Sequence, residues 1–543
     1  MIATLIWAVY AGVVAILFAV ASIFVHVYQT PRDRSPLVTL TCTVAITSLL
    51  ATILLLPVDV ALVSSTVSSA VGQRRDWATQ EVVDSITFSL TLVHYILYSL
   101  DILLCLLVVP FVYFWYEEYD EVAAQAGEQS FGQRFWGALK YTLSFVAIAI
   151  ILFLIGFFVP FARKNGNDGL DLFKSTGSER ALTFALGLLS TIGMCIYVMY
   201  TSTGLAVLPT RLIKRPLLVS PVQLESNRER QRQLQGRCGG NPELLSHKDR
   251  RELDALVREE RTLIRRQRLV EADQPFLVRA WSRIETFLCP SKLLIGLILF
   301  LVVLLTWVSM LLAVIKPLYG GGNIFNPINQ ILVQSAKVFP IDYVIFTMLA
   351  LLFFSGTVAG IATIGIRFLW ISIFQVRKGH TSPQAFLFMT TLLMLGILAL
   401  NYSMSMIVAP QYATFGPQTF CSTSDCTETK HLVQPCSKAV DNDAARRVCT
   451  PSVASTVLNR VTIHFPLFGA ILFWGQFVFL GIHLLALLIS LLRSPNLDER
   501  QLDEDAEEAE EEALLASSRR NTNTRWQNVI GRASRREAAD ESH

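Results

Sequence analysis

The chain has 543 residues, of which 52% are hydrophobic and 16% are charged, and its mean hydropathy is +0.46. A soluble domain is about 45–50% apolar and about 25% charged, so this composition excludes a set of soluble globular domains. The formal net charge of +3 is too small to indicate a nucleic-acid-binding protein. The sequence therefore predicts an all-α, polytopic membrane protein that is surrounded by membrane lipid and binds no nucleic acid.

Hydrophobic stretches long enough to cross about 30 Å of hydrocarbon recur along the chain. We expect nine transmembrane helices, at residues 1–25, 37–56, 88–115, 141–161, 181–208, 293–315, 344–366, 385–408 and 465–492. The second is expected to end at Pro57, just before Asp59, because proline interrupts helices. The chain then divides into 1–208 with the first five helices, a basic loop with a helical segment at 209–292, 293–492 with the last four helices and a cysteine-rich loop at 409–463, and an acidic disordered tail at 493–543.

The basic loop at 209–292 predicts the orientation of the chain. It holds 18 Lys and Arg against 11 Asp and Glu, and loops rich in these cations stay on the cytosolic side. Counting outward from it places the N-terminus on the lumenal or extracellular side and the C-terminus in the cytosol. Within the loop, residues 249–267 show partly helical spacing, which indicates a helical hairpin against the membrane, a partner-binding helix, or an exposed charged helix.

Cys421, Cys426, Cys436 and Cys449 lie together in the loop before the ninth helix, on the side that the count places in the lumen. Four cysteines in one short loop are typical of disulfide bonds, which persist in oxidising compartments. Three pairings are possible, and the spacing does not choose among them. A zinc site is the alternative, although these cysteines lack the paired short spacing that such sites favour.

Ionisable residues within the expected helices are candidates for function, because an unpaired charge in hydrocarbon is costly. His94 and Asp101 are the clearest, since Asp101 lies near the middle of the third helix and seven residues place both on nearly the same face. This pair either lines a polar cavity or forms hydrogen bonds within the helix packing. The others lie near helix ends, where snorkelling or capping explains them: Asp59, Lys140, Asp342, Arg367, His464 and His483.

Two stretches rich in glycine predict local structure: one a helix contact, the other a short helix that does not span the membrane. Gly356 and Gly360 have the spacing that lets membrane helices approach closely, and they form either a dimer contact or a packing contact within one subunit. Residues 320–322 are three glycines that lead into an apolar stripe at 324–333, which is too short to span the membrane. We expect an interfacial or re-entrant helix there, on the lumenal side.

The polar C-terminal tail holds a candidate sorting signal. Glu510, Leu514 and Leu515 resemble the acidic dileucine signal that clathrin adaptors read, in a segment too polar to fold alone. By contrast, the sequence contains no phosphate-binding glycine loop, zinc-protease histidine pair or nucleophile elbow. We therefore expect a protein that is not an enzyme, binds no metal, holds no covalently bound cofactor and does not hydrolyse ATP itself.

Several short sequences resemble the limb-region-like (LMBR-type) membrane protein family, and most closely its lysosomal branch. The resemblance implies a lysosomal, dimeric membrane protein that helps its cargo cobalamin (vitamin B12) to leave the lysosome with an ABC transporter of subfamily D. Family members also act as lipocalin receptors and clathrin-linked adaptors, which implies endosomes and the plasma membrane as further locations. The matching pieces are Leu56–Asp59, Pro110–Glu118, Lys140–Leu143, Gly204, Leu208–Pro209, Ile213–Lys214, Phe339–Tyr343, Pro383–Ala385 and Ala409–Tyr412.

Three functions agree with these observations. The first is an escort and partner of a cobalamin-exporting ABC transporter, and the second is an endocytic receptor or adaptor whose cysteine loop binds a ligand. The third is a transporter or channel in its own right, for which His94 and Asp101 are the direct sequence support. The sequence assigns no residue to cobalamin binding, and the expected lumenal loops lack the glycosylation sites that lysosomal membrane proteins commonly carry.

Overall fold

The computed structural model divides into two units, Met1–Pro209 with Leu299–Ser490, and Thr210–Ile298 with Leu491–His543. Every structural statement below concerns the residues that the structure describes. These are 2–30, 34–69, 71–119, 130–158, 177–214, 221–236, six residues between 253 and 264, 289–316, 326–368, 371–376, 381–421, 433–436 and 443–492.

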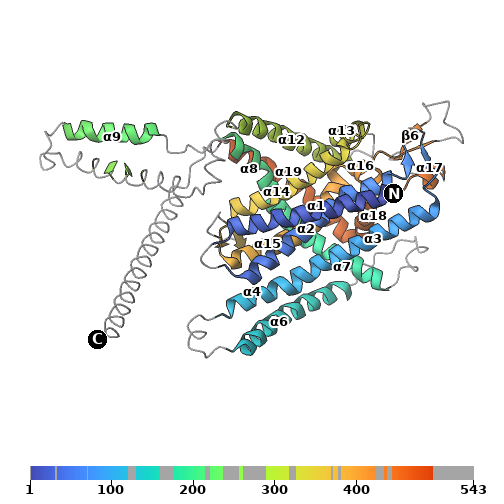
Figure 1. Ribbon diagram of the computed structural model, residues 1–543, viewed down its shortest axis with the longest axis horizontal. Helices are drawn as coiled ribbons and strands as arrows, with labels where there is room; N and C mark the ends of the chain where they lie inside the picture. Colours follow the sequence, from blue (N-terminus) through green and yellow to red (C-terminus); the bar gives the residue numbers. More distant parts are fainter. Residues whose placement is uncertain are drawn as a thin grey trace, which may run out of the picture. The chain divides into compact units, whose positions relative to one another are not determined.

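Nine helices in the described ranges are long and apolar enough to cross a membrane, which confirms the expected number. Three of them change to π-helical hydrogen bonding along their length, so each is built from more than one element (Figure 1). In chain order the elements are α1 (Ile2–Tyr28), α2 (Pro36–Ser64), α3 (Gln80–Leu103) with η1 (Leu104–Val108) and α4 (Val109–Glu117), α6 (Phe131–Phe158), α7 (Gly177–Ile196) with η3 (Tyr197–Thr201) and α8 (Ser202–Ile213), α12 (Cys289–Ile315), α14 (Ile341–Ile364), α15 (Pro383–Ser403) with η6 (Met404–Val408), and α19 (Pro466–Leu492).

Helices α2 and α15 form the centre of the larger unit. They pack against each other, and α1, α3 and α14 also contact α2, while α7 lies along α15. Both helices carry apolar side chains all around their circumference, so each can be buried on all sides. Leu49 and Ile53 of α2 and Phe386 of α15 are accordingly inaccessible to solvent. The peripheral α1 instead presents large apolar side chains outward, among them Leu5 and Ile16, as a lipid-facing helix does.

The expected end of the second helix at Pro57 is wrong. Helix α2 continues through Pro57 to Ser64, and Asp59 lies inside it with no exposed surface. Proline is tolerated within membrane helices because neighbouring groups satisfy the backbone groups that it frees. The extra two turns carry the Asp59 carboxylate into the protein interior instead of leaving it at a helix end.

Gly356 and Gly360 make a close helix contact within one subunit. A Cβ atom added at Gly360 would overlap the carbonyl oxygen of Tyr200 in η3, so only glycine allows this approach. The hydroxyl groups of Thr201 and Thr357 hydrogen-bond at 2.9 Å beside the same crossing. The pair therefore holds α14 against the η3 segment of the same chain.

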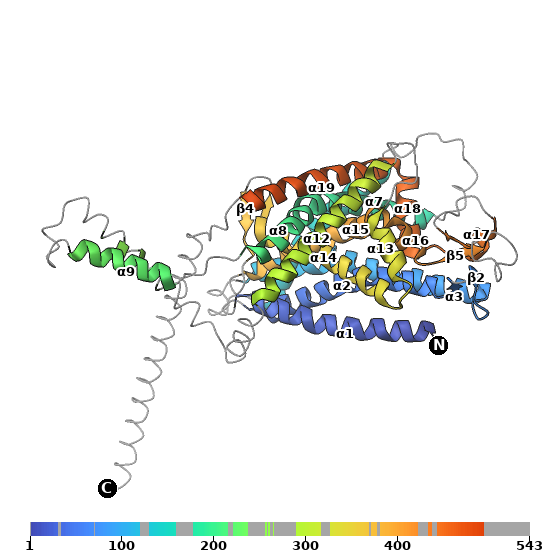
Figure 2. The same ribbon diagram turned by 90° about the horizontal axis from the view of Figure 1, so that it is seen from above.

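Short elements gather at one end of the helical bundle, which we call the disulfide end (Figure 2). Strands β1 (Val67–Ser68) and β2 (Gln73–Arg74) form an antiparallel hairpin between α2 and α3, with Val67 opposite Arg74. The other elements there are α13 (Pro327–Ser335), α16 (Pro410–Phe415), β5 (Thr419–Cys421), β6 (Val433–Pro435), α17 (Asp443–Val448) and α18 (Val453–His464).

The structure is mostly helical, as expected, but it contains small antiparallel ladders that the all-α prediction did not include. Strand β5 pairs with β6 at the disulfide end, with Cys421 opposite Val433. Strand β3 (Ile366–Phe368) pairs with β4 (Ile371–Phe374) after α14. Helix α13 lies where an interfacial or re-entrant helix was expected, while the glycines at 320–322 fall outside the described residues.

The second unit contains a helix that the sequence reading missed, α9 (Pro221–Gly236). It contacts the segment around 253–264, whose described residues are helical. Arg228 forms an ion pair with Glu260 at 2.8 Å, and the Gln231 amide donates to the backbone oxygen of Leu256 and to Glu260. The segment therefore pairs with α9 in a helical hairpin, while its expected position against the membrane or a partner stays a prediction.

Candidate functional site

Polar side chains between α2 and α3 form a row that we call the polar seam, made of Ser48, Thr52, Asp59, His94 and Asp101. Asp101 lies at one end and is 5% exposed. Its two carboxylate oxygens accept hydrogen bonds from Ser48 Oγ at 2.5 Å and from Thr52 Oγ1 at 2.8 Å. Ser48 and Thr52 are one helical turn apart on α2, so together they satisfy both oxygens of one carboxylate.

Asp59 forms the other end of the polar seam. Its carboxylate accepts the backbone N–H groups of Val453 at 3.2 Å and Ala454 at 2.8 Å, which are the first residues of α18. A helix N-terminus leaves such N–H groups unpaired and attracts negative charge. His94 Nε2 lies 4.0 Å from Asp59 Oδ2, and the His94 Nδ1 atom hydrogen-bonds to the Leu90 carbonyl oxygen at 2.9 Å.

The two ends of the seam are related by matching spacing on antiparallel helices. His94 and Asp101 are seven residues apart on α3, and their partners Asp59 and Thr52 are seven residues apart on α2. Seven residues make about two helical turns, so both pairs fall on the faces that the helices present to each other. His94 and Asp101 thus share a face as expected, but each is bound to α2 and neither to the other.

Both carboxylates of the seam already accept hydrogen bonds from protein groups, and little open space lies beside them. A cavity next to Asp101, lined by apolar residues such as Leu186 and Met394, has a volume of about 20 Å³. A cavity needs roughly 10–15 Å³ to hold one water molecule. The Asp101 side of the seam therefore has space for about one water molecule, far less than a vitamin-sized cargo needs.

The remaining ionisable candidates divide between surface and interior. Asp342 and His483 are buried, so neither side chain snorkels to the surface. Asp342 does lie in the first turn of α14, near a helix end as expected, and His483 Nδ1 hydrogen-bonds to the Ser202 carbonyl oxygen at 3.0 Å. Tyr412 donates its hydroxyl to Asp342 Oδ2 at 2.7 Å. Burial, together with the Asp342 charge, raises the pKa of Tyr412 far above its ordinary value of 10, so this donor stays protonated. The expectation of a surface position fits the remaining three, Lys140, Arg367 and His464, which are exposed.

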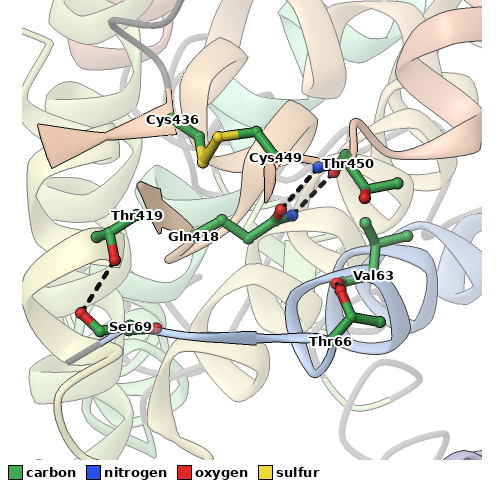
Figure 3. The surroundings of a disulfide bond; sticks show 8 residues. All are labelled: Val63, Thr66, Ser69, Gln418, Thr419, Cys436, Cys449 and Thr450. Carbon is green, nitrogen blue, oxygen red and sulfur yellow. Dashed lines mark hydrogen bonds between the residues drawn. A yellow bond between two sulfur atoms is a disulfide. The ribbon is translucent and has the colours of Figure 1, made fainter. Parts of the chain in front are cut away.

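The cysteine loop contains a disulfide bond between Cys436 and Cys449 (Figure 3). Cys421 is also disulfide-bonded, and Cys426 lies outside the described residues. Since bonded sulfurs cannot act as thiolate ligands, the zinc alternative does not apply to the paired cysteines. No group of three or more metal-ligating side chains occurs in the part of the chain that the structure describes.

Hydrogen bonds join the disulfide loop to the α2–α3 hairpin. Thr419 donates its hydroxyl to the Ser69 carbonyl oxygen at 3.0 Å, as Figure 3 shows, and the Cys421 N–H donates to Gly72 at 3.0 Å. Gly72 has φ of 68°, and a Cβ there would lie 2.8 Å from the Phe420 carbonyl carbon, so the turn requires glycine. The loop before the ninth span is therefore anchored to the loop between the second and third.

Sequence reasoning missed the position of Asp59 and the partners of His94. A signal was present, because Ser48, Thr52 and Asp59 follow one helical face once α2 is extended through Pro57. The α18 N-terminus that completes the site lies 394 residues away from Asp59, and no local pattern indicates it. The candidate sorting residues Glu510, Leu514 and Leu515 lie outside the described residues.

Comparison with known proteins adds relatives of full length. Residues 7–291 match the model of the LMBR1-like membrane protein family. The "Probable lysosomal cobalamin transporter" of Emericella nidulans is 70% identical over 98% of this chain and 99% of that protein. A protein of the same name from Aspergillus terreus is 63% identical over 98% of this chain and 98% of its own length. Another, from Ajellomyces capsulatus, is 56% identical over 98% of this chain and 97% of its own length. No solved structure matches. The chain therefore belongs to the LMBR1-like membrane protein family, as its short sequence matches implied.

Proposed function

We propose that this chain is a lysosomal membrane protein that takes part in the release of cobalamin from the lysosome into the cytosol. The observation that carries the proposal is the full-length similarity to relatives named lysosomal cobalamin transporter, at 70% identity over 98% of the chain. Similarity of that extent covers the membrane helices, the polar seam and the disulfide end together. The proposal includes no enzymatic activity, no resident cofactor and no metal.

We place the disulfide end and the N-terminus in the lysosomal lumen and the C-terminal tail in the cytosol. The Cys436–Cys449 disulfide supports this placement, because disulfides persist on the oxidising side of a membrane. The basic residues of 209–292 support it from the other side, since such loops stay in the cytosol. The nine candidate spans among the described residues support this placement, because an odd number of crossings would leave the two termini on opposite faces.

Within this function we favour an escort of an ABC transporter of subfamily D over a conduit for cobalamin. The polar seam was the sequence support for a conduit, but its carboxylates are satisfied by Ser48, Thr52 and the α18 backbone. The space beside Asp101 is about 20 Å³. The sequence holds no ATP-binding motif, so in this proposal the partner hydrolyses ATP. We also propose homodimer formation and clathrin-adaptor binding by the tail.

A second candidate function is an endocytic receptor or adaptor at endosomes and the plasma membrane. The disulfide end favours it, because a folded and cross-linked loop is suited to binding a ligand outside the cytosol. Replacing Leu514 and Leu515 with Ala tests its sorting element. Lysosomal residence that is unchanged in this variant would contradict the dileucine proposal.

The main experiment loads cells that lack this protein with labelled cobalamin and measures the fraction retained in lysosomes. We expect retention without the chain and release when it is restored. Normal release without it would contradict the export function and favour the receptor. The His94→Leu/Asp101→Leu variant is then tested, with Asp101→Asn as the matched conservative variant. Normal export by a correctly folded and localised double variant is expected for an escort, whereas lost export would indicate a polar pathway.

A further inference from the structure

A groove of about 380 Å³ opens between α3 and α18 at the disulfide end. Three arginines line it, and each comes from a different element: Arg74 from β2, Arg446 from α17 and Arg460 from α18. Figure 1 shows α3, α17 and α18 gathered at this end of the bundle. We call this feature the arginine groove. Its volume lies within the range of about 300–1,000 Å³ that is usual for small-molecule sites.

The arginine groove carries an excess of positive charge. Against the three arginines, the groove lining contains one acidic residue, Asp84. The Asp84 carboxylate accepts a hydrogen bond from the Gln80 amide at 2.9 Å. None of the three arginines forms an ion pair with any described residue. Unpaired guanidinium groups that converge on one concave surface raise the local concentration of anions.

Arg74 also has a buried donor without a partner. Its Nη1 atom donates to Gln80 Oε1 at 2.6 Å, whereas its Nε atom is buried and makes no hydrogen bond. Buried donors are nearly always satisfied in native proteins, so an exception calls for an explanation. Because the Nε atom is buried, a ligand oxygen in the groove would reach this N–H group only after the Arg74 side chain moves.

The elements that hold the arginines are fixed in place. Arg74 is paired with Val67 in the β1–β2 hairpin, and the disulfide partner Cys449 itself lines the groove. Helix α18 is capped by Ser452 and by the Asp59 carboxylate, which positions Arg460 two turns along. A preformed arrangement of charges loses little entropy when it binds a ligand.

We propose that the arginine groove binds a phosphate group. The planar guanidinium fork matches the oxygen atoms of a phosphate group, which it binds through paired hydrogen bonds. Of the three lining hydroxyls on α3, those of Thr87 and Thr91 donate to backbone oxygens of their own helix, so Tyr95 is the one that adds a neutral donor beside this charge. The phosphate group has three possible sources: a lipid headgroup, a soluble phosphate, and the phosphodiester in the nucleotide loop of cobalamin. The inference does not depend on the cobalamin export function.

The test measures binding to the purified full-length protein in a neutral detergent. The probes are dioctanoyl phosphatidate with uncharged dioctanoylglycerol, inorganic phosphate, and cobalamin with cobinamide, which lacks the nucleotide phosphodiester. We expect at least one phosphate-bearing probe to bind and its uncharged or phosphate-free counterpart to bind more weakly. The probe that binds identifies the source, and binding of phosphatidate alone would leave the export function untouched.

The assignment to this groove is tested with variants. Arg74→Gln and Arg460→Gln should each weaken binding about tenfold or more, because each removes charge-assisted hydrogen bonds. The matched controls Arg75→Gln and Arg447→Gln remove the same charge from exposed neighbours that do not line the groove. Equal weakening by the controls would overturn the proposal, as would failure of every phosphate probe to bind the folded natural protein.

Discussion

Removal of the Asp59 carboxylate should strongly destabilise the bundle. Asp59 has no exposed surface, and it accepts the N–H groups of Val453 and Ala454. An Asp59→Ala variant leaves both donors buried and unpaired, at about 1–3 kcal/mol each. We therefore expect the free energy of unfolding to fall by about 2–6 kcal/mol. Asp59→Asn keeps one acceptor oxygen and should lose about half as much.

The measurement is unfolding of the purified protein by increasing SDS in mixed micelles, followed by tryptophan fluorescence. Asp76→Ala is the control, because Asp76 is an exposed carboxylate in the loop between α2 and α3, and exposed substitutions usually change stability by less than about 0.5 kcal/mol. The expected order of stability is the natural protein and Asp76→Ala, then Asp59→Asn, then Asp59→Ala. Equal unfolding curves for Asp59→Ala and Asp76→Ala would refute the argument.

Three further predictions concern other parts of the chain. Gly360→Ala should lower the free energy of unfolding by about 1–3 kcal/mol, because the new Cβ overlaps η3. Gly12→Ala is the control, since no atom lies within 4 Å of its new Cβ. The same SDS titration compares the two variants, and an equal loss of stability in both would refute the close contact. Cys436→Ser should lower the free energy of unfolding by about 2–4 kcal/mol. It should also leave the Cys449 thiol free to react with a maleimide without reductant. Absence of this new reactivity would contradict the disulfide. Hydrogen bonds from Arg228 and then Gln231 lower the pKa of Glu260, so the carboxylate stabilises the α9 hairpin above the ordinary glutamate pKa, and this stability is lost as pH falls through the lowered value. Hydrogen exchange of α9, corrected for intrinsic rates, should show that loss in the natural chain and not in Glu260→Gln, and identical pH profiles would contradict it.

The membrane helices could be predicted from the sequence because the hydrocarbon imposes a strong local rule. Each span must satisfy its own backbone hydrogen bonds and must be apolar over about 20 residues, so composition alone locates it. The third helix and its His94 and Asp101 face followed from this rule. The three π-helical segments did not, because a π-helical turn depends on packing with neighbouring helices and has no compositional signature.

The site was less predictable, because its partners come from distant parts of the chain. Asp59 was assigned to a helix end since Pro57 precedes it, and only the packing of α2 shows that the helix continues. The arginine groove brings together Arg74 from strand β2, near the start of the sequence, and Arg460 from helix α18, near its end. Helical periodicity carries no information about such pairs, while the full-length relatives establish the family without locating a site.

The distance along the chain between Asp59 and its partners constrains the order of assembly during synthesis. The Ala454 N–H group lies 395 residues after Asp59, and ribosomes add about 5–20 residues each second. The second span thus waits about 20–80 s in the membrane before the α18 N-terminus emerges to meet its carboxylate. Throughout that interval the Asp59 carboxylate lacks the two backbone donors that it has in the finished fold. The contact between α2 and α18 therefore forms only after nearly the whole helical bundle has been synthesised.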